Sequence, residues 1–567
     1  MNNNINMRKK LVMCVLTISY FFCISHIFFL GLSKDDAAMR NIVTGNMTGI
    51  NEAHVNYLNY IYSKVIAVLY GLIENINWYG IIEIFSFMLF FYCVSIHISK
   101  LWNKSRVLCC IIWLIFVIIF AIVTTPMLIE MNFTYVADMF GGVAIVSLIM
   151  ATEEDLKKKS VWIKVLVCLV ICYWIRSEVF FTTIPYIALV LFWLLIKKKI
   201  NINKIVIVGL IFFALIYVSK WINYSAYQYE WSNLRQYSDA KAILFDFYGW
   251  PDYDECKDIY QRYNVDREAA ALFDKKCYVI DNADVSELFV ELAAYQEQKN
   301  SEISLSYKIR TVLSTLIYYF TNSDFVLMHY IILTLLIINC LYGAKIGGYT
   351  YSLYLICSAA FYVLCAAYLV FIGRTIERAV VGIQFLLIVF LGMQIIKNMC
   401  ETLSDKKGYY VPYLILFFII VGYAAWTDLG ENQLLSNKLK DRDRICSDIR
   451  DYTDSNKDNL YIISDGYYAF DIENSINERK YCHNILSLSG WQPLSKIWKD
   501  VLNEYNVKIL WKDMLYKSNI YYIDCKNTNT EKQKQQIEAY YKEKYGAIKW
   551  VTVYEKEEYK IIKPVVR

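Results

Sequence analysis

Two adjacent carboxylates, Asp35 and Asp36, directly follow the first long apolar segment, residues 11–32. Like charges at the mouth of a membrane helix repel each other and cannot enter hydrocarbon, so their position indicates a site rather than a solvated turn. A carboxylate whose pKa is raised toward neutrality by its neighbour suits general-base chemistry. The alternative is structural, because Asp is also favoured at the start of a helix such as one beginning at Ala37.

Further polar residues recur at the ends of apolar runs that we expect on the same side of the membrane. They are Arg40 and His54 in the first outer loop, Glu130 and Asp138 around the second, Arg176 and Glu178 between the fifth and sixth runs, and Arg374, Glu377 and Arg378 before the tenth. An arginine stays charged and presents a fork of donors that matches a phosphate. We therefore predict a site that binds a lipid-linked phosphate beside a base.

Several of these residues also have a structural interpretation. Arg374 and Arg378 could snorkel to the interface or pair with Glu377, and Arg176 with Glu178 could form a simple ion pair. His54 could be a hydrogen-bonded interfacial histidine. The sequence predicts no definite cofactor, and it leaves open whether a divalent metal ion takes part.

The elements that must position these residues are membrane helices. The 567 residues are 57% hydrophobic and 16% aromatic, and the apolar residues form runs of about 20, the length that crosses a bilayer. The net charge of +5 is small for this length, which argues against a nucleic-acid partner. We expect a polytopic helical membrane protein with about eleven spans, near 11–32, 78–98, 107–125, 134–151, 161–175, 179–196, 204–222, 325–342, 349–371, 378–396 and 410–427.

Lysine and arginine gather in alternate loops, which indicates the orientation because positive loops stay cytoplasmic. The N-terminus is then cytoplasmic, and loops 33–77 and 225–322 and the tail lie outside. Residues 55–73 contain Lys64 and several tyrosines, so we expect an interfacial helix there and not a span. The first segment is interpreted as an anchor and not as a cleaved signal peptide, because its core is too long. The tail alternates strand-like pieces (460–463, 507–510, 520–523, 550–554) with helical ones, which predicts an α/β domain. We divide the chain into residues 1–430, a transmembrane catalytic domain, and residues 431–567, an extracytoplasmic domain.

This pattern resembles the GT-C glycosyltransferases, integral membrane enzymes that use polyprenyl-phosphate sugars. The motif that carries the resemblance is Asp35-Asp36-x-x-Met39-Arg40-x-Ile42-x-x-Gly45, followed by Thr48-Gly49 and His54, and it is similar to that of a bacterial branch of the family. Gly373-Arg374-x-x-x-Arg378 is similar to the place where such enzymes hold the lipid phosphate. The resemblance implies that Asp35 or Asp36 is the catalytic base or a metal ligand.

The resemblance implies a glycosyltransferase in the plasma membrane that moves a hexosyl or pentosyl unit, with inversion, from a polyprenyl-phosphate carrier to a glycan, lipid or protein acceptor of the cell envelope. The tail lacks the Trp-Trp-Asp motif of oligosaccharyltransferases, which argues against transfer of a whole oligosaccharide to protein. Two alternatives stay open. One is a polymerase or ligase of O-antigen-type polysaccharide, and the other is a non-enzymatic transporter or scaffold.

The charge bias makes the orientation testable. A cysteine introduced at Glu557 should react with a membrane-impermeant maleimide in intact cells, whereas a cysteine at Lys158 should react only after permeabilisation, because its loop is basic and cytoplasmic. The parent protein gives the background from its own cysteines. Labelling at position 158 but not at 557 in intact cells would invert the orientation.

Overall fold

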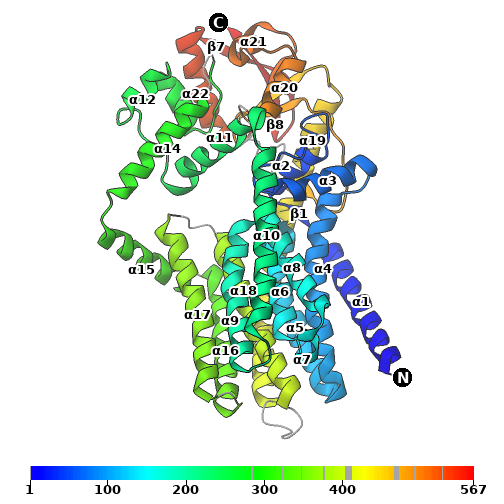
Figure 1. The fold of residues 1–567 in the computed structure, drawn as a ribbon. Coiled ribbons are helices and arrows are strands. Elements are labelled where there is room, and N and C mark those ends of the chain that lie inside the picture. Colours follow the sequence, from blue (N-terminus) through cyan, green and yellow to red (C-terminus); the bar gives the residue numbers. More distant parts are fainter. Residues whose placement is uncertain are drawn as a thin grey trace.

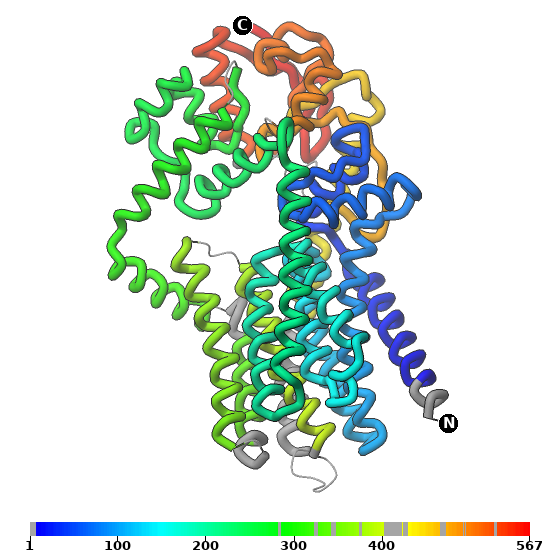
Figure 2. The backbone as a smooth tube through the Cα atoms, viewed as in Figure 1, coloured from blue at the N-terminus to red at the C-terminus, as the bar shows by residue number. Residues whose placement is uncertain are grey.

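The computed structural model describes residues 2–281, 285–321, 323–346, 348–373, 377–402, 411–464, 472–490, 493, 495–526 and 528–567. A bundle of long helices forms one half of the molecule, and a mixed domain of short helices and strands forms the other (Figure 1). The first helix runs beside the bundle and points away from the mixed domain, and the chain ends in the mixed domain (Figure 2).

The expected polytopic helical architecture is confirmed, and each of the eleven apolar runs is helical. The bundle consists of α1 (Asn2–Ile27), α4 (Trp78–Ile98), α5 (Arg106–Ile129), α6 (Phe133–Ile149), α8 (Lys159–Ile175), α9 (Ser177–Ile196), α10 (Ile202–Ala226), α16 (Ser323–Ile346), α17 (Gly348–Phe371), α18 (Glu377–Thr402) and the first part of α19 (Val411–Asp454). Within the described residues, seven helices are long and apolar enough to cross a membrane. The first helix ends at Ile27, earlier than expected, because residues 31–32 pair as a strand.

Helix α6 is the central helix of the bundle. It packs against α4, α8, α9 and α18, and nearly all of its side chains are buried. Asparagine caps set where such helices begin: Asn132 accepts the N–H of Thr134 at the start of α6, and Asn77 accepts that of Gly80 in α4. These caps fix the bundle end that faces the mixed domain.

A small three-stranded sheet joins the bundle to the mixed domain. Strand β1 (Gly31–Leu32) pairs in parallel with β2 (Glu130–Met131) and antiparallel with β4 (Glu473–Asn474). Helix α2 (Lys34–Val43) lies beside this sheet, and α3 (Tyr60–Leu72) packs against α2. Helix α3, the segment expected at the interface, has 13 residues. It spans about 20 Å, which is too short to cross the hydrocarbon layer.

The mixed domain combines the long loop with the C-terminal residues. The loop supplies η2 (Tyr229–Trp231), α11 (Ser232–Ala242), η3 (Ile243–Phe247), α12 (Lys257–Arg262), α13 (Arg267–Asp274) and α14 (Val285–Ser301). Its last helix, α15 (Leu305–Thr321), packs against α16 and α17 of the bundle. The tail supplies β3 (Leu460–Ile463), β5 (Ile485–Ser487), α20 (Lys496–Glu504), α21 (Leu510–Tyr516), β6 (Ile520–Cys525), α22 (Thr528–Lys544), β7 (Ile548–Glu555) and β8 (Tyr559–Val566). The shorter connecting elements of the bundle are η1 (Ser99–Asn103) and α7 (Glu153–Lys157).

Five of these strands form a mixed sheet of order β5-β3-β6-β8-β7, which confirms the expected α/β tail. The loop and the tail share one hydrophobic core, in which Tyr237, Phe273 and Phe289 lie in the same cluster as Trp511 and Tyr541. Helix α19 continues unbroken past residue 430, where we divided the chain. The loop and tail therefore form one folded body above the bundle.

One predicted strand, residues 507–510, is wrong. Those residues form a turn that leads into α21, because the Asp513 carboxylate accepts the backbone N–H groups of Lys508 (2.7 Å) and Ile509 (3.3 Å). These hydrogen bonds stabilise the turn, and they occupy the backbone N–H groups that a strand would pair with a neighbour.

A buried ionic network fastens α2 to the mixed domain. Glu473 of β4 accepts hydrogen bonds from Arg40 Nη1 (2.5 Å) and Asn41 Nδ2 (2.8 Å) and also from Arg450 of α19. Burial alone would raise the pKa of Glu473, but Arg40 and Arg450 outweigh it and lower the pKa. Arg40 also pairs with Glu478 through Nη2, so both terminal nitrogens of its guanidinium group have carboxylate partners.

The network should be essential for stability. Glu473→Gln leaves Arg40 and Arg450 buried with poorer partners, and breaking a buried ionic pair costs about 3–5 kcal/mol. We expect a clear fall of the thermal unfolding midpoint in detergent. The control is Glu74→Gln, which removes the exposed Glu74–Lys480 pair and should cost at most about 1 kcal/mol. Equal midpoints for the two variants would contradict the role given to Glu473.

Candidate active site

Asp36 is a completely buried carboxylate that joins three elements. Its oxygens accept hydrogen bonds from Ser33 Oγ (2.7 Å), from Tyr79 Oη of α4 (2.7 Å) and from the backbone N–H of Phe133 at the start of α6 (3.1 and 3.2 Å). Glu83 of α4 also hydrogen-bonds to it, and burial raises the pKa of Asp36 to about 6. Asp36 therefore lies at the N-terminus of α6, where a carboxylate is favoured, and holds that terminus against α2.

Phe133, whose backbone N–H donates to Asp36, lies close to two arginines. The Cζ atom of Arg176 lies 5.0 Å from the centroid of the Phe133 ring, and that of Arg378 lies 5.8 Å from it. Tyr57 stacks on the same ring at 5.3 Å, and Arg176 also lies over Tyr57. These distances are within the range of cation–π attraction. Phe133 thus brings together guanidinium groups from positions about 200 residues apart in the sequence.

Asp35, in contrast to Asp36, is partly exposed and faces the arginines. Its Oδ2 atom lies 3.4 Å from Arg378 Nη1, and its side chain is 25% exposed. This distance is longer than the 2.7–2.9 Å typical of a charge-assisted hydrogen bond. Arg378 therefore has donor capacity left for a ligand.

A lysine of the mixed domain lies close enough to respond to the charge of the same carboxylate. Burial lowers the pKa of Lys241 in α11 to about 8, while the charges of Asp35 and Asp246 act in the opposite direction. Loop 225–322 thereby contributes a cation to the surroundings of Asp35. Its approach to the bundle is close, because a Cβ atom at Gly373 would lie 3.2 Å from the backbone oxygen of Phe247.

A cavity of about 540 Å³ opens between α6, α9, α17 and α18 beside the pair. Its polar lining includes Arg176, Glu178, Arg378 and Asp138, and its remaining wall is mainly apolar, with Phe181, Pro185, Phe361, Leu364, Leu369 and Ile383. Arg176 Nε lies 3.0 Å from Glu178 Oε2, and Glu178 is 55% exposed. The cavity therefore combines positive charge with an apolar surface that could accompany a hydrocarbon chain.

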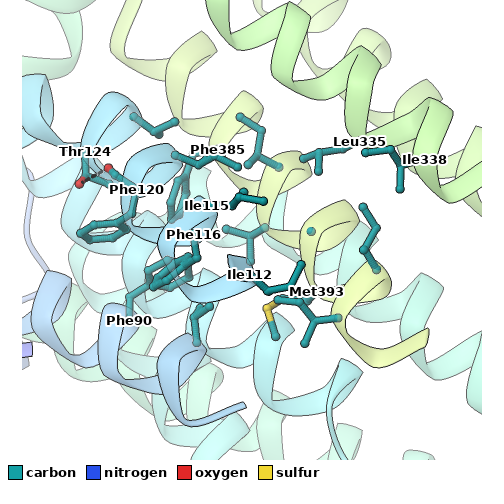
Figure 3. A pocket seen from close by; sticks show the side chains of 18 residues that line it. Phe90, Ile112, Ile115, Phe116, Phe120, Thr124, Leu335, Ile338, Phe385 and Met393 are labelled. Atoms are coloured by element: carbon teal, nitrogen blue, oxygen red, sulfur yellow. Dashed lines mark hydrogen bonds between the residues drawn. The ribbon is translucent and has the colours of Figure 1, made fainter. Parts of the chain in front are cut away.

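A second cavity, deeper in the bundle, has a different character. It measures about 110 Å³ and is lined by apolar side chains of α4, α5, α16 and α18, including Phe90, Phe120, Leu335, Phe385 and Met393 (Figure 3). Thr124, the polar residue of its described lining, donates its hydroxyl to the backbone oxygen of Phe120. With no cation in this lining, the cavity is unsuited to a phosphate.

The structure brings some of the predicted site residues together and separates others. Arg176, Glu178 and Arg378 line the first cavity, and Asp35 contacts Arg378 at its edge. Asp36 binds the backbone N–H of Phe133. Arg40 is engaged by Glu473 and Glu478 instead of lining the cavity. The His54 ring nitrogens contact Glu52 (2.6 Å) and the backbone oxygen of Ala226 (3.0 Å), and the ring stacks on Trp231. Arg374 lies outside the described residues.

Sequence reasoning missed three side chains of this region: Phe133, Tyr57 and Lys241. Nothing in the local pattern marks Phe133, because its role comes from its place after the Asn132 cap and beside residues distant in sequence. Lys241 lies in a loop whose position over the bundle is set by tertiary packing. Asp138 did carry a signal, since it is an ionisable residue inside an apolar run.

The described residues contain no group of three or more His, Cys, Asp or Glu side chains close enough to hold a metal ion. Asp35 and Arg378 place a carboxylate beside an arginine.

No protein-family model and no curated protein matches the chain. Among solved structures, the chain is similar to the crystal structure of ArnT from Cupriavidus metallidurans bound to undecaprenyl phosphate, with a TM-score of 0.38 and 10% identity over 97% of this chain and 97% of that chain. At this identity, the match carries no site residue over to this chain.

The two neighbouring aspartates should respond differently to truncation. Asp36→Ala leaves the Tyr79 hydroxyl and the Phe133 N–H buried without this acceptor, which costs about 1–3 kcal/mol for an unsatisfied group. Asp35→Ala removes one long, partly exposed ion pair and should cost at most about 1 kcal/mol. Thermal unfolding of both variants in one detergent measures the difference. A larger loss for Asp35→Ala would show that the structural roles are reversed.

Proposed function

We propose that this protein is a membrane glycosyltransferase of the GT-C type. It moves one sugar, a hexose or a pentose, from a polyprenyl-phosphate carrier to a glycan, lipid or protein acceptor of the cell envelope. The observation that carries the proposal is the Asp35–Arg378 pair beside a cavity that has two arginines and a mainly apolar wall. A base, a phosphate site and a hydrocarbon path are the parts that such a transfer needs.

The donor phosphate would lie between Arg176 and Arg378, with the start of its prenyl chain along the apolar wall. Guanidinium groups keep their charge there and can each present paired donors. They would stabilise the negative charge that builds up on the phosphate as the sugar leaves. The Phe133 ring, which lies near both guanidinium groups, would hold them on the same side of the phosphate.

In the proposed reaction, Asp35 removes the proton of the acceptor hydroxyl. The acceptor oxygen forms a bond to the anomeric carbon of the sugar while the bond from that carbon to the phosphate oxygen breaks, and the electron pair stays on the phosphate. One displacement of this kind inverts the anomeric carbon. Asp35 is better placed for this role than Asp36, because Asp36 is completely buried and already accepts hydrogen bonds from Ser33, Tyr79 and the Phe133 N–H.

The acceptor would approach from the mixed domain, whose Lys241 is close enough to respond to the charge of Asp35. This arrangement requires the mixed domain and the mouth of the cavity to lie on the outer face of the plasma membrane, with the N-terminus in the cytoplasm. The charge distribution of the loops supports that orientation.

A transfer assay in membranes tests the proposal. Losing a positioned base costs about 10²–10⁴ in rate, so Asp35→Asn should lose transfer while it keeps its unfolding midpoint. Arg378→Lys keeps the charge but loses the fork, so its KM for the lipid-linked donor should rise.

The matched control is Arg262→Lys, which changes an arginine of α12 that pairs with Glu291 and does not line the cavity. This variant should keep the parent's donor KM. Full activity of Asp35→Asn would contradict the base. Transfer of whole polysaccharide chains in place of single sugars would favour the polymerase or ligase.

A further inference from the structure

Asp138 is a buried carboxyl group that the proposed reaction does not yet use. It lies on the central helix α6, its side chain is 1% exposed, and it forms part of the lining of the 540 Å³ cavity. Its Oδ2 atom has no hydrogen-bond partner within the described part of the chain. A polar atom left unpaired in such a place is costly, which makes it a candidate for contact with a ligand.

The fold makes room for this carboxyl group at a glycine of the facing helix. A Cβ atom at Gly382 of α18 would lie 2.3 Å from Asp138 Oδ2 and 3.0 Å from Asp138 Cγ. Gly382 follows Arg378 by four residues, so both lie on one face of α18. Asp138 is therefore held about one helical turn from the arginine at which we place the donor phosphate.

The charged and titratable groups around Asp138 are few. Arg176, Glu178 and Arg378 share the cavity, and α17 contributes Cys365 and Tyr368 to its lining. Cys172 of α8 and Tyr135 of α6 are close enough to feel the charge of Asp138. No cation of the described residues lies within ion-pair distance of its carboxyl group. An ionised carboxylate there would be unpaired in apolar surroundings, whereas the neutral acid can donate a hydrogen bond.

We propose that Asp138 is a donor-binding residue whose neutral carboxyl group donates a hydrogen bond to an oxygen of the lipid-linked phosphate held by Arg176 and Arg378. The inference rests on the proposed function, because it requires the phosphate to occupy this cavity. A carboxylate at this position would repel the phosphate, and an apolar residue would leave one phosphate oxygen without a donor. Asp138 thereby selects for a phosphate against an uncharged lipid head group.

Binding measurements on the full-length protein in lipid nanodiscs test this role. The probes are undecaprenyl phosphate and undecaprenol, the same chain without the phosphate. The measured ratio is the dissociation constant of undecaprenol divided by that of undecaprenyl phosphate, so a high ratio means a preference for the phosphate. Asp138→Asn keeps an N–H donor of the same shape and should hold the parent ratio within about threefold. Asp138→Leu has no donor and should lower the ratio about tenfold or more, as expected for a lost hydrogen bond to a charged group.

A second pair of variants tests the Asp138 carboxyl group without replacing Asp138: one variant disturbs it, and the other is the control. Gly382→Ala places a methyl group against the Asp138 carboxyl and should lower the ratio as Asp138→Leu does. Gly392→Ala, on the same helix with nothing within 4 Å of the new methyl group, should keep the parent ratio. The comparison stands even if Asp138→Leu fails to fold.

The outcomes separate the inference from the proposed function. Arg378→Gln should lose the preference for phosphate in either case. If Arg378→Gln loses it but Asp138→Leu and Gly382→Ala keep it, the role of Asp138 is wrong and the phosphate site stands. If Asp138→Asn is as poor as Asp138→Leu, the ionised carboxylate is what matters and the inference is overturned. If Arg378→Gln also keeps the preference, both proposals fail.

Discussion

The hydrogen bonds from the Phe133 backbone N–H to the buried carboxylate of Asp36 set the position of everything around the cavity. They fix the first turn of the central helix α6 against α2, and Ser33 and Tyr79 tie the same carboxylate to the residue before α2 and to α4. A buried carboxylate needs such donors, because its desolvation is otherwise uncompensated. The neighbouring residue in sequence, Asp35, is consequently presented to Arg378 with a defined geometry. Two adjacent aspartates thus take different roles, one as an anchor and one at the surface of the site.

Two further constraints depend on this anchor. The Phe133 ring, once fixed, holds Arg176 and Arg378 within cation–π distance, so two positive groups share one wall despite their mutual repulsion. The network of Arg40, Glu473 and Arg450 fastens the other end of α2 to the mixed domain. As a result, α2, which carries Asp35, is held to the bundle at one end and to the mixed domain at the other. The cavity between α6, α9, α17 and α18 is the space that these fixed walls enclose.

The helical architecture could be predicted from the sequence, because apolar runs of membrane length are a strong and local signal. The α/β character of the tail followed from alternating patterns, although residues 507–510 show how one carboxylate, Asp513, can convert a strand-like piece into a turn. The site was predictable in part. Charged residues at helix ends pointed to Asp35, Arg176 and Arg378, but no local pattern distinguishes them from Arg40 and His54, which other parts of the chain engage. Those partners lie up to several hundred residues away, and only the fold shows them.

We propose that Arg176 and Arg378 form the binding site for a lipid-linked phosphate. An experimental structure of the full-length protein with undecaprenyl phosphate in a lipid nanodisc would test this site directly. We expect phosphate oxygens within about 3.2 Å of guanidinium nitrogens of both arginines, with the prenyl chain entering along Phe361 and Leu364. A phosphate bound elsewhere, with Arg378 still paired to Asp35 and Arg176 still paired to Glu178, would contradict it.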